Sequence, residues 1–209
     1  MKKIVLIGDI ISSKRIKNRN EIQRKLVKLF KKINKGNKGL VSPYTITLGD
    51  EFQALYQNAD NLFNDVWQIM LDLYPERIRF SIGIGELTTR VNKRQAIGMD
   101  GPAFYNARAG LNQLKTTTFM LNLTDNEEGK FTLINQVLFF ISSFIKKWKH
   151  TRISIFNMLN KELTIKEISL KMKISDKAVY KNIYTGNMFI IMKLFDEITK
   201  ELNKAIGKK

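Results

Sequence analysis

The sequence has 209 residues, 44% of them hydrophobic and 26% charged, which is the composition of a folded globular protein and excludes a mainly disordered chain. It contains no cysteine, so disulfides and thiolate metal sites are excluded, and no apolar run approaches the roughly 20 residues of a membrane-spanning helix. The formal net charge of +17 is spread over both halves and favours polyanionic partners such as nucleic acid, nucleotides or acidic lipid, although a general lysine bias would also produce it.

The chain opens with a predicted strand and helix. Residues 3–11 form an apolar run with β-branched side chains, which predicts a buried strand. Because Asp9 interrupts this run early, the segment lacks the form of a signal peptide, and we expect a cytoplasmic protein that does not associate with membranes. Residues 19–35 place apolar side chains at helical spacing with basic ones opposite, which predicts an amphipathic helix that ends at glycine.

A hairpin comes next, and helices and strands continue to alternate. The predicted elements are strands at 44–48 and 52–56, a helix at 60–74, a strand at 78–84, a helix at 102–114 and a strand at 117–123. This order predicts an α+β fold of the ferredoxin-like kind, an antiparallel sheet with helices on one face. Such a sheet places its first strand centrally, beside a hairpin strand, so Asp9 and Asp50 would meet.

From about residue 126 the strand patterns stop. All remaining segments are predicted to be helical, at 131–148, 153–159, 164–172, 176–184 and 188–206. We therefore predict two domains, an α/β domain at 1–125 and an all-α domain at 126–209. The excess of positive charge is shared between them, with 20 Lys and Arg against 11 Asp and Glu in the first and 16 against 8 in the second.

Residues 163–183 of the second domain have the pattern of a helix-turn-helix. Thr164 and Glu167 form a capping-box pattern at the first helix, and Ser175 is placed to cap the second. The pattern resembles that of bacterial regulators, with Lys173 where those proteins have glycine in the turn. The residues predicted to face DNA are Ser175, Asp176, Lys177, Tyr180 and Lys181, together with Tyr184.

One such unit reads few base pairs, so we expect a homodimer on duplex DNA. The alternative is a three-helix bundle that mediates dimerisation or protein contacts.

Three carboxylates of the first domain are candidate metal ligands. Asp9 lies inside an apolar strand, where a charge is costly unless it is paired, hydrogen-bonded or bound to a metal. Asp50 and Glu51 follow Gly49 at the hairpin tip. The simpler interpretations are backbone hydrogen bonds at a strand end for Asp9 and ordinary turn chemistry for the other two. Together, however, a strand Asp and a hairpin Asp are suited to hold Mg²⁺ or Mn²⁺ against a nucleoside triphosphate.

Two of these segments resemble known nucleotide enzymes. Segment 7–11, Ile-Gly-Asp-Ile-Ile, looks like the metal-binding first strand of class III nucleotidyl cyclases, and segment 47–54 resembles their second metal-binding hairpin and the last four letters of the GGDEF motif. Segment 79–85 resembles the strand that follows. The resemblance implies a palm-like domain in which Asp9, Asp50 and the backbone carbonyl of Ile10 bind two metals, with Glu51 as an extra ligand.

Nearly the whole chain resembles the SatD family more closely. The matching residues lie at 8–10, 47–53, 83–85, 99–103 and 107–108, followed by the C-terminal helices. Around the carboxylates, the residues expected to contact a nucleotide are Gly8, Ile10, Ser12, Ser13, Arg15, Gly49, Arg94 and Arg108.

The chain departs from the cyclase pattern at one important place. Class III cyclases set Asn and Arg four residues apart on a helix, whereas Asn106 and Arg108 are two apart, roughly 200° around a helix. The sequence therefore favours a DNA-binding regulator whose N-terminal domain binds a nucleotide with a divalent metal. The alternatives are an active nucleotidyl cyclase or nucleotidyltransferase, with the helices used for dimerisation or localisation, and an adaptor with two vestigial domains.

Overall fold

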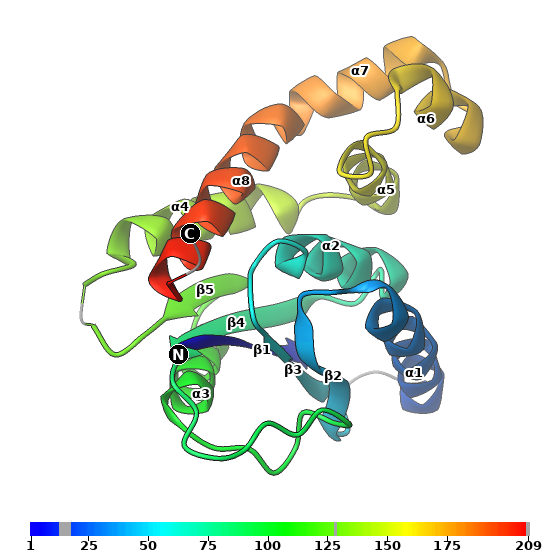
Figure 1. Cartoon of the computed structure of the whole chain (residues 1–209). Coiled ribbons are helices and arrows are strands. Elements are labelled where there is room, and N and C mark those ends of the chain that lie inside the picture. Colours follow the sequence, from blue (N-terminus) through cyan, green and yellow to red (C-terminus); the bar gives the residue numbers. More distant parts are fainter. Residues whose placement is uncertain (13–17, 128, 208–209) are drawn as a thin grey trace.

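A five-stranded sheet and eight helices make up the part of the chain that the computed structural model describes, residues 1–12, 18–127 and 129–207 (Figure 1). In chain order the elements are β1 (Lys3–Ile10), α1 (Arg19–Gly36), β2 (Leu40–Leu48), β3 (Glu51–Tyr56), α2 (Leu62–Asp72), β4 (Ile78–Gly85), α3 (Pro102–Lys115), β5 (Leu121–Thr124), α4 (Thr132–Ile145), α5 (His150–Leu159), α6 (Ile165–Met172), α7 (Asp176–Thr185) and α8 (Met188–Ala205). Each predicted segment is present with its predicted type. The largest shifts are at β2, which begins four residues earlier than predicted, and at β5, which begins four residues later.

The sheet has the strand order β2-β3-β1-β4-β5, so β1 lies in its centre as predicted. β1 pairs antiparallel with β3 and with β4. The prediction of a wholly antiparallel sheet is wrong at one edge, because β4 and β5 pair in parallel. The physical reason is the connection, since α3 crosses over the sheet between these two strands and returns the chain in the same direction.

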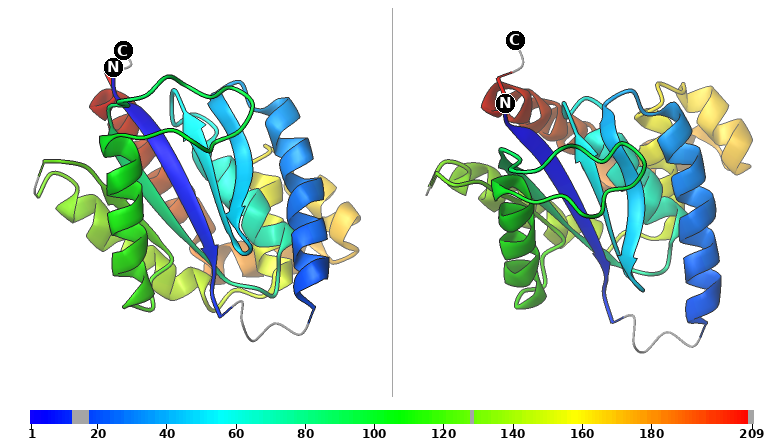
Figure 2. Two further views of the ribbon diagram at one scale, coloured as in Figure 1. Left: turned by 90° about the horizontal axis from the view of Figure 1, so that it is seen from below. Right: turned by 60° about the horizontal axis from the view of Figure 1, so that its bottom comes forward.

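Helices cover both faces of the sheet, which corrects the prediction that they lie on one face (Figures 1 and 2). Side chains of β1 alternate between the two faces. Ile4 and Leu6 join the large core beneath α1 and α2, whereas Val5 and Ile7 join a smaller core beneath α3. An unbroken apolar run is typical of a strand buried on both sides, and that is the environment of β1.

α3 packs directly against β4 because glycines remove the side chains between them. A Cβ atom on Gly83 would lie 2.2 Å from the backbone nitrogen of Ala107, and one on Gly85 would lie 2.5 Å from that of Ala103. Such distances leave no room for a side chain. The close approach fixes the position of α3, and with it the polar residues of its C-terminal half, over the central strands.

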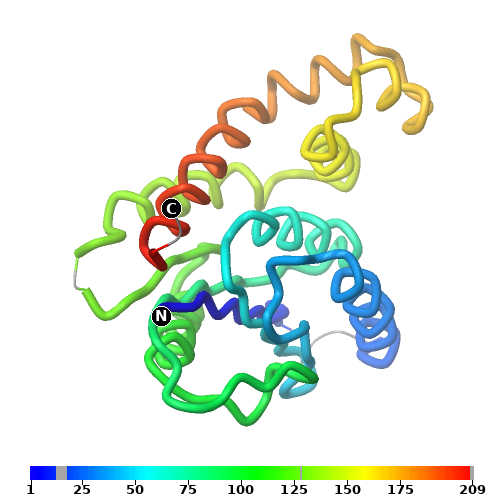
Figure 3. Tube along the Cα trace, viewed as in Figure 1, coloured from blue at the N-terminus to red at the C-terminus, as the bar shows by residue number. Residues whose placement is uncertain are grey.

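The helical part of the chain shares one apolar core with the α/β part. The Trp67 ring of α2 packs 4.3 Å from Phe156 of α5 and 5.5 Å from Phe195 of α8, measured between centroids. Figure 3 traces α8 from α7 back to the α/β part, where the Asn203 side chain accepts a hydrogen bond from the Ala59 nitrogen at 2.8 Å. A domain boundary near residue 125 stays a prediction, and this shared core means that both parts are best studied in the whole chain.

α6 and α7 are joined by a tight turn and are capped as predicted. The Thr164 side chain accepts from the Glu167 nitrogen while the Glu167 carboxylate accepts from the Thr164 nitrogen, which completes a capping box. The Ser175 hydroxyl accepts from the Ala178 nitrogen at the start of α7. Lys173, at the position where regulators have glycine, adopts the left-handed conformation with φ of 54°. In the described part of the chain no helix is both long and apolar enough to cross a membrane.

Candidate functional site

Three charged residues of the central strands lie side by side on the face that α3 covers. Asp9 of β1 is directly opposite Glu51 of β3 and directly opposite Arg79 of β4 in the strand register. Residues that are paired in this way project from the same face of a sheet. The register therefore gathers two carboxylates and a guanidinium at the end of β1.

Asp9 is held by two cations from the elements around it. Arg79 places Nη1 3.2 Å from Oδ2 of Asp9 and donates from Nε to the Leu114 carbonyl at 3.1 Å. Lys115, at the end of α3, places Nζ 3.9 Å from the other carboxylate oxygen. Burial nevertheless raises the pKa of Asp9, and the neighbouring charge of Asp50 raises it further while Lys115 and Arg79 oppose the change.

The hairpin turn brings Asp50 to the end of β1. The Ile10 nitrogen donates to the Asp50 carbonyl at 3.3 Å, and Gly49 accommodates the turn with a positive φ of 59°. Asp50 itself is half-buried. The fold thus brings together the two aspartates that the sequence placed 41 positions apart.

Glu51 is engaged by Arg108 of α3. Nη1 and Nη2 of Arg108 each lie 2.6 Å from a carboxylate oxygen of Glu51, and the hydroxyl of Thr47 is 3.3 Å from Oε1. Glu51 is only 5% exposed, and its hydrogen bond raises the pKa of Arg108. Within the described residues no three His, Cys, Asp or Glu side chains form a metal-binding group.

The predicted nucleotide-binding residues near β1 occupy different environments. Gly8 lies on the opposite face of the sheet from Asp9. A Cβ atom on Gly8 would fall 2.1 Å from the Phe52 ring, so a residue without a side chain is needed here to make room for that ring. Ser12 is exposed just beyond β1 with a positive φ of 58°. Ser13 and Arg15 lie outside the described residues.

Arg94 belongs to the connection between β4 and α3, which crosses the sheet beside α3 (Figure 2). It is exposed, and its nitrogen donates to the Asn92 side chain at 3.0 Å. The segment is held over β2 and β3 because the Ala96 nitrogen donates to the Thr45 hydroxyl at 2.9 Å and the Gln53 amide donates to the Ala96 carbonyl. This segment and α3 together border the carboxylate site.

Sequence reasoning missed Arg79 and Lys115. The alternation of β4 was a usable signal for Arg79, because a cation in an otherwise apolar strand requires a partner. No comparable signal marked Lys115, which reaches Asp9 only through the packing of α3. Asn106 and Arg108 point to different partners, as their spacing predicted: Asn106 donates to the Ile84 carbonyl at 2.7 Å, whereas Arg108 contacts Glu51.

The second candidate surface is the outer face of α7. The side chains predicted to contact DNA are all exposed on it, as is Tyr184. Val179 and Ile183 are buried beneath them. Tyr180 and Tyr184 are 46% and 70% exposed, and their rings stack on each other with centroids 6.3 Å apart. An exposed aromatic pair flanked by lysines is a surface suited to contact with another molecule.

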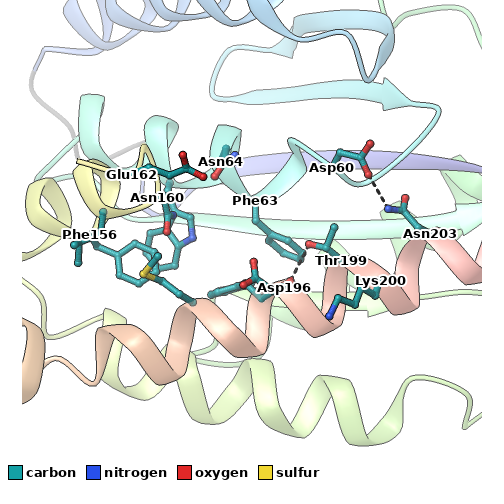
Figure 4. Close-up of a pocket in the computed structure, with 14 residues that line it drawn as sticks. Asp60, Phe63, Asn64, Phe156, Asn160, Glu162, Asp196, Thr199, Lys200 and Asn203 are labelled. Atoms are coloured by element: carbon teal, nitrogen blue, oxygen red, sulfur yellow. Dashed lines mark hydrogen bonds between the residues drawn. The ribbon is translucent and has the colours of Figure 1, made fainter. Parts of the chain in front are cut away.

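A cleft of about 590 Å³ lies between α2, α5 and α8 (Figure 4). Its floor consists of the rings of Phe63, Trp67, Phe156 and Phe195, each at most 5% exposed. In Figure 4 the Asp60 and Asn203 side chains point toward one another at its rim, joined by a hydrogen bond of 2.8 Å. These rings pack against one another, with centroids 4.6 Å apart for Phe63 and Phe195 and 4.3 Å apart for Trp67 and Phe156.

Comparison with known proteins identifies the family to which this chain belongs. The profile of the SatD family matches residues 3–200, which is nearly the whole chain, so the protein belongs to the SatD family. No curated protein matches the chain.

Proposed function

We propose that this member of the SatD family is a DNA-binding regulatory protein whose α/β part binds a nucleotide together with a divalent metal. The nucleotide-binding part of this proposal rests on the position of Asp9, a buried carboxylate at the end of the central strand beside Asp50. The element order β1-α1-β2-β3-α2-β4, with β1 between β3 and β4, supports a ferredoxin-like, palm-like core for this half.

The two aspartates fit a divalent cation. Burial and the charge of Asp50 both disfavour ionised Asp9, and a metal between the two carboxylates would relieve both effects. Mg²⁺ or Mn²⁺ would supply charge neutralisation for bound phosphates. Arg79 and Lys115 lie beside Asp9 and would position the carboxylate or contact the same phosphates.

The test uses the full-length protein. Affinity for each nucleoside triphosphate is measured with Mg²⁺, with Mn²⁺ and with chelator, in the wild type and in the variant Asp9→Asn/Asp50→Asn. We expect metal-dependent binding that the double variant loses, while Asp72→Asn, which removes an exposed charge from α2, keeps it. Equal affinity with and without metal and in the double variant would reject the proposal.

Separation of the products after incubation decides between binding and turnover. A cyclic or transferred product would favour the alternative of an active cyclase or nucleotidyltransferase. The contacts of Arg108 with Glu51 argue against that alternative. Both terminal nitrogens of this guanidinium already donate to the Glu51 carboxylate, so they are not available to stabilise a transition state.

The DNA half of the proposal rests on α6 and α7. We interpret them as a helix-turn-helix whose second helix presents Lys177, Tyr180 and Lys181 to the major groove. All three side chains are exposed on the outer face of α7, so they are accessible to a phosphate backbone. A homodimer on a two-fold site is expected.

Retention of duplex DNA by the whole chain at several salt concentrations tests this half. Lys177→Ala/Lys181→Ala should weaken binding. It should also make the negative slope of log affinity against log salt less steep by about two, one for each lost phosphate contact. The matched control is Lys200→Ala/Lys204→Ala, since each of these lysines is paired with a glutamate of its own helix. Wild-type protein that shows no salt-sensitive retention would contradict a role in DNA binding.

A further inference from the structure

A basic pocket opens at the end of β1, next to the carboxylate site. It has a volume of about 420 Å³ and is lined by Ile11, Arg77, Arg79, Thr117, Thr118, Met120, Lys146 and Lys147. The lining comes from four separate stretches of chain: the residue after β1, the residues at and just before the start of β4, the connection between α3 and β5, and the residues just after α4. The fold therefore assembles this pocket, which no single segment of the sequence would reveal.

The charge of the pocket has one sign. Half of its lining residues are cationic, and none of the described lining residues is acidic. Like charges that converge on a concave wall raise the local positive potential and attract anions. Lys146 and Lys147 follow the last residue of α4, where the helix dipole favours cations, but this effect does not account for Arg77 and Arg79, which line the same pocket.

Arg79 connects this pocket to the carboxylate site. Arg79, whose guanidinium lies 3.2 Å from Oδ2 of Asp9, is also one of the residues that line the pocket. Arg77 is held at the same end of the sheet because the Ile11 nitrogen donates to its carbonyl at 2.8 Å. A ligand with one phosphate at Asp9 and further phosphates along its chain would extend past Arg79 toward Arg77 and the two lysines.

We infer that the basic pocket binds the phosphate chain of a nucleoside triphosphate whose metal-bound phosphate lies at Asp9 and Asp50. This inference rests on the nucleotide binding proposed above. The guanidinium of arginine and the ammonium group of lysine form strong, charge-assisted hydrogen bonds with phosphoryl oxygens. Thr118 is an exposed residue of the wall, and its hydroxyl could donate a further hydrogen bond to a phosphate. The pocket would thus select triphosphates over monophosphates of the same nucleoside.

The experiment compares nucleotides of different phosphate number. The variant Arg77→Gln/Lys146→Gln/Lys147→Gln removes three cations from exposed or half-buried positions, and equal melting temperatures would verify that it folds. We expect its affinity for a nucleoside triphosphate with Mg²⁺ to fall by about tenfold or more, since hydrogen bonds to charged groups are among the stronger ones. Its affinity for the monophosphate should stay within about twofold.

The matched control is Arg24→Gln/Lys28→Gln/Lys31→Gln, which removes the same charge from exposed positions of α1. It should leave both affinities unchanged. If the pocket variant binds the triphosphate as tightly as the control does, while Asp9→Asn/Asp50→Asn does not bind it, the inference is wrong and the proposed nucleotide site stands.

Inorganic tripolyphosphate distinguishes a nucleotide from free polyphosphate as the ligand that supplies the phosphate chain. Wild-type protein should bind it without added metal, and the pocket variant should lose that binding. If tripolyphosphate binds in this way but no nucleotide does, the pocket holds free polyphosphate and the proposed nucleotide function fails. If neither probe distinguishes the pocket variant from its control, the pocket has no role in phosphate binding.

Discussion

The carboxyl group of Asp65 allows a quantitative test of the packing between the sheet and its helices. Asp65 lies in α2 and is 8% exposed. Its Oδ2 accepts hydrogen bonds from the Tyr56 hydroxyl and the Asn37 amide, both at 2.5 Å, and the Tyr56 hydroxyl is also hydrogen-bonded to that of Tyr44. Burial outweighs these hydrogen bonds and raises the pKa of Asp65 to about 6.

The substitution Asp65→Asn keeps the shape of the side chain and removes its charge. A rise in pKa from 3.8 to about 6 corresponds to about 3 kcal/mol, at about 1.4 kcal/mol per unit. Because the folded-state pKa is raised, the contribution of this group to stability is fully present below pH 3.8 and is lost as the pH rises through 6. The free energy of unfolding of the variant should therefore exceed that of the wild type by about 3 kcal/mol at pH 8 and match it below about pH 4.

Urea unfolding followed by fluorescence of the two tryptophans, repeated across this pH range, measures the difference directly. Asp72→Asn is the control, because it removes an equal charge from an exposed position of the same helix. Two outcomes would refute the reasoning: parallel stability curves for Asp65→Asn and wild type across the range, or a wild type that is the more stable protein at pH 8. Either one would mean that the ionised carboxylate is stabilised by its donors.

Three further predictions concern the packing that positions the two candidate surfaces. Gly83→Ala should destabilise the fold by about 3 kcal/mol in urea unfolding, because its Cβ would meet the α3 backbone, whereas Gly36→Ala, with nothing within 4 Å, should not destabilise it. Arg108→Met should lower the free energy of unfolding by about 2 kcal/mol, because it removes the ion-pair partner of buried Glu51; this figure is reduced for the partial exposure of Arg108. The double variant Arg108→Met/Glu51→Leu should recover most of this loss. Thr164→Ala should lower the free energy of unfolding by about 1 kcal/mol through loss of the capping box. An unchanged melting temperature in calorimetry would contradict this contribution of the cap.

The sequence alone determined where the elements lie and several of their ends. Periodicity of apolar residues identified every strand and helix, because the periods of 2 and 3.6 are local properties of the chain. The caps of α6 and α7 were predictable for the same reason, since each cap hydrogen bond of Thr164, Glu167 and Ser175 joins residues only three positions apart in the sequence. The strand order implied that Asp9 and Asp50 would approach, and the register brings them together at the end of β1.

Tertiary structure alone decided which partner each buried group has. Periodicity shows that a face is buried but not what buries it, so the position of α3 opposite α1 and α2 and the parallel edge at β5 were not predictable. The contacts of Arg79 with Asp9 and of Arg108 with Glu51, and the basic pocket beside them, join segments far apart in the chain. Such contacts depend on strand register and on how closely α3 approaches β4, and both are set by packing across the whole sheet.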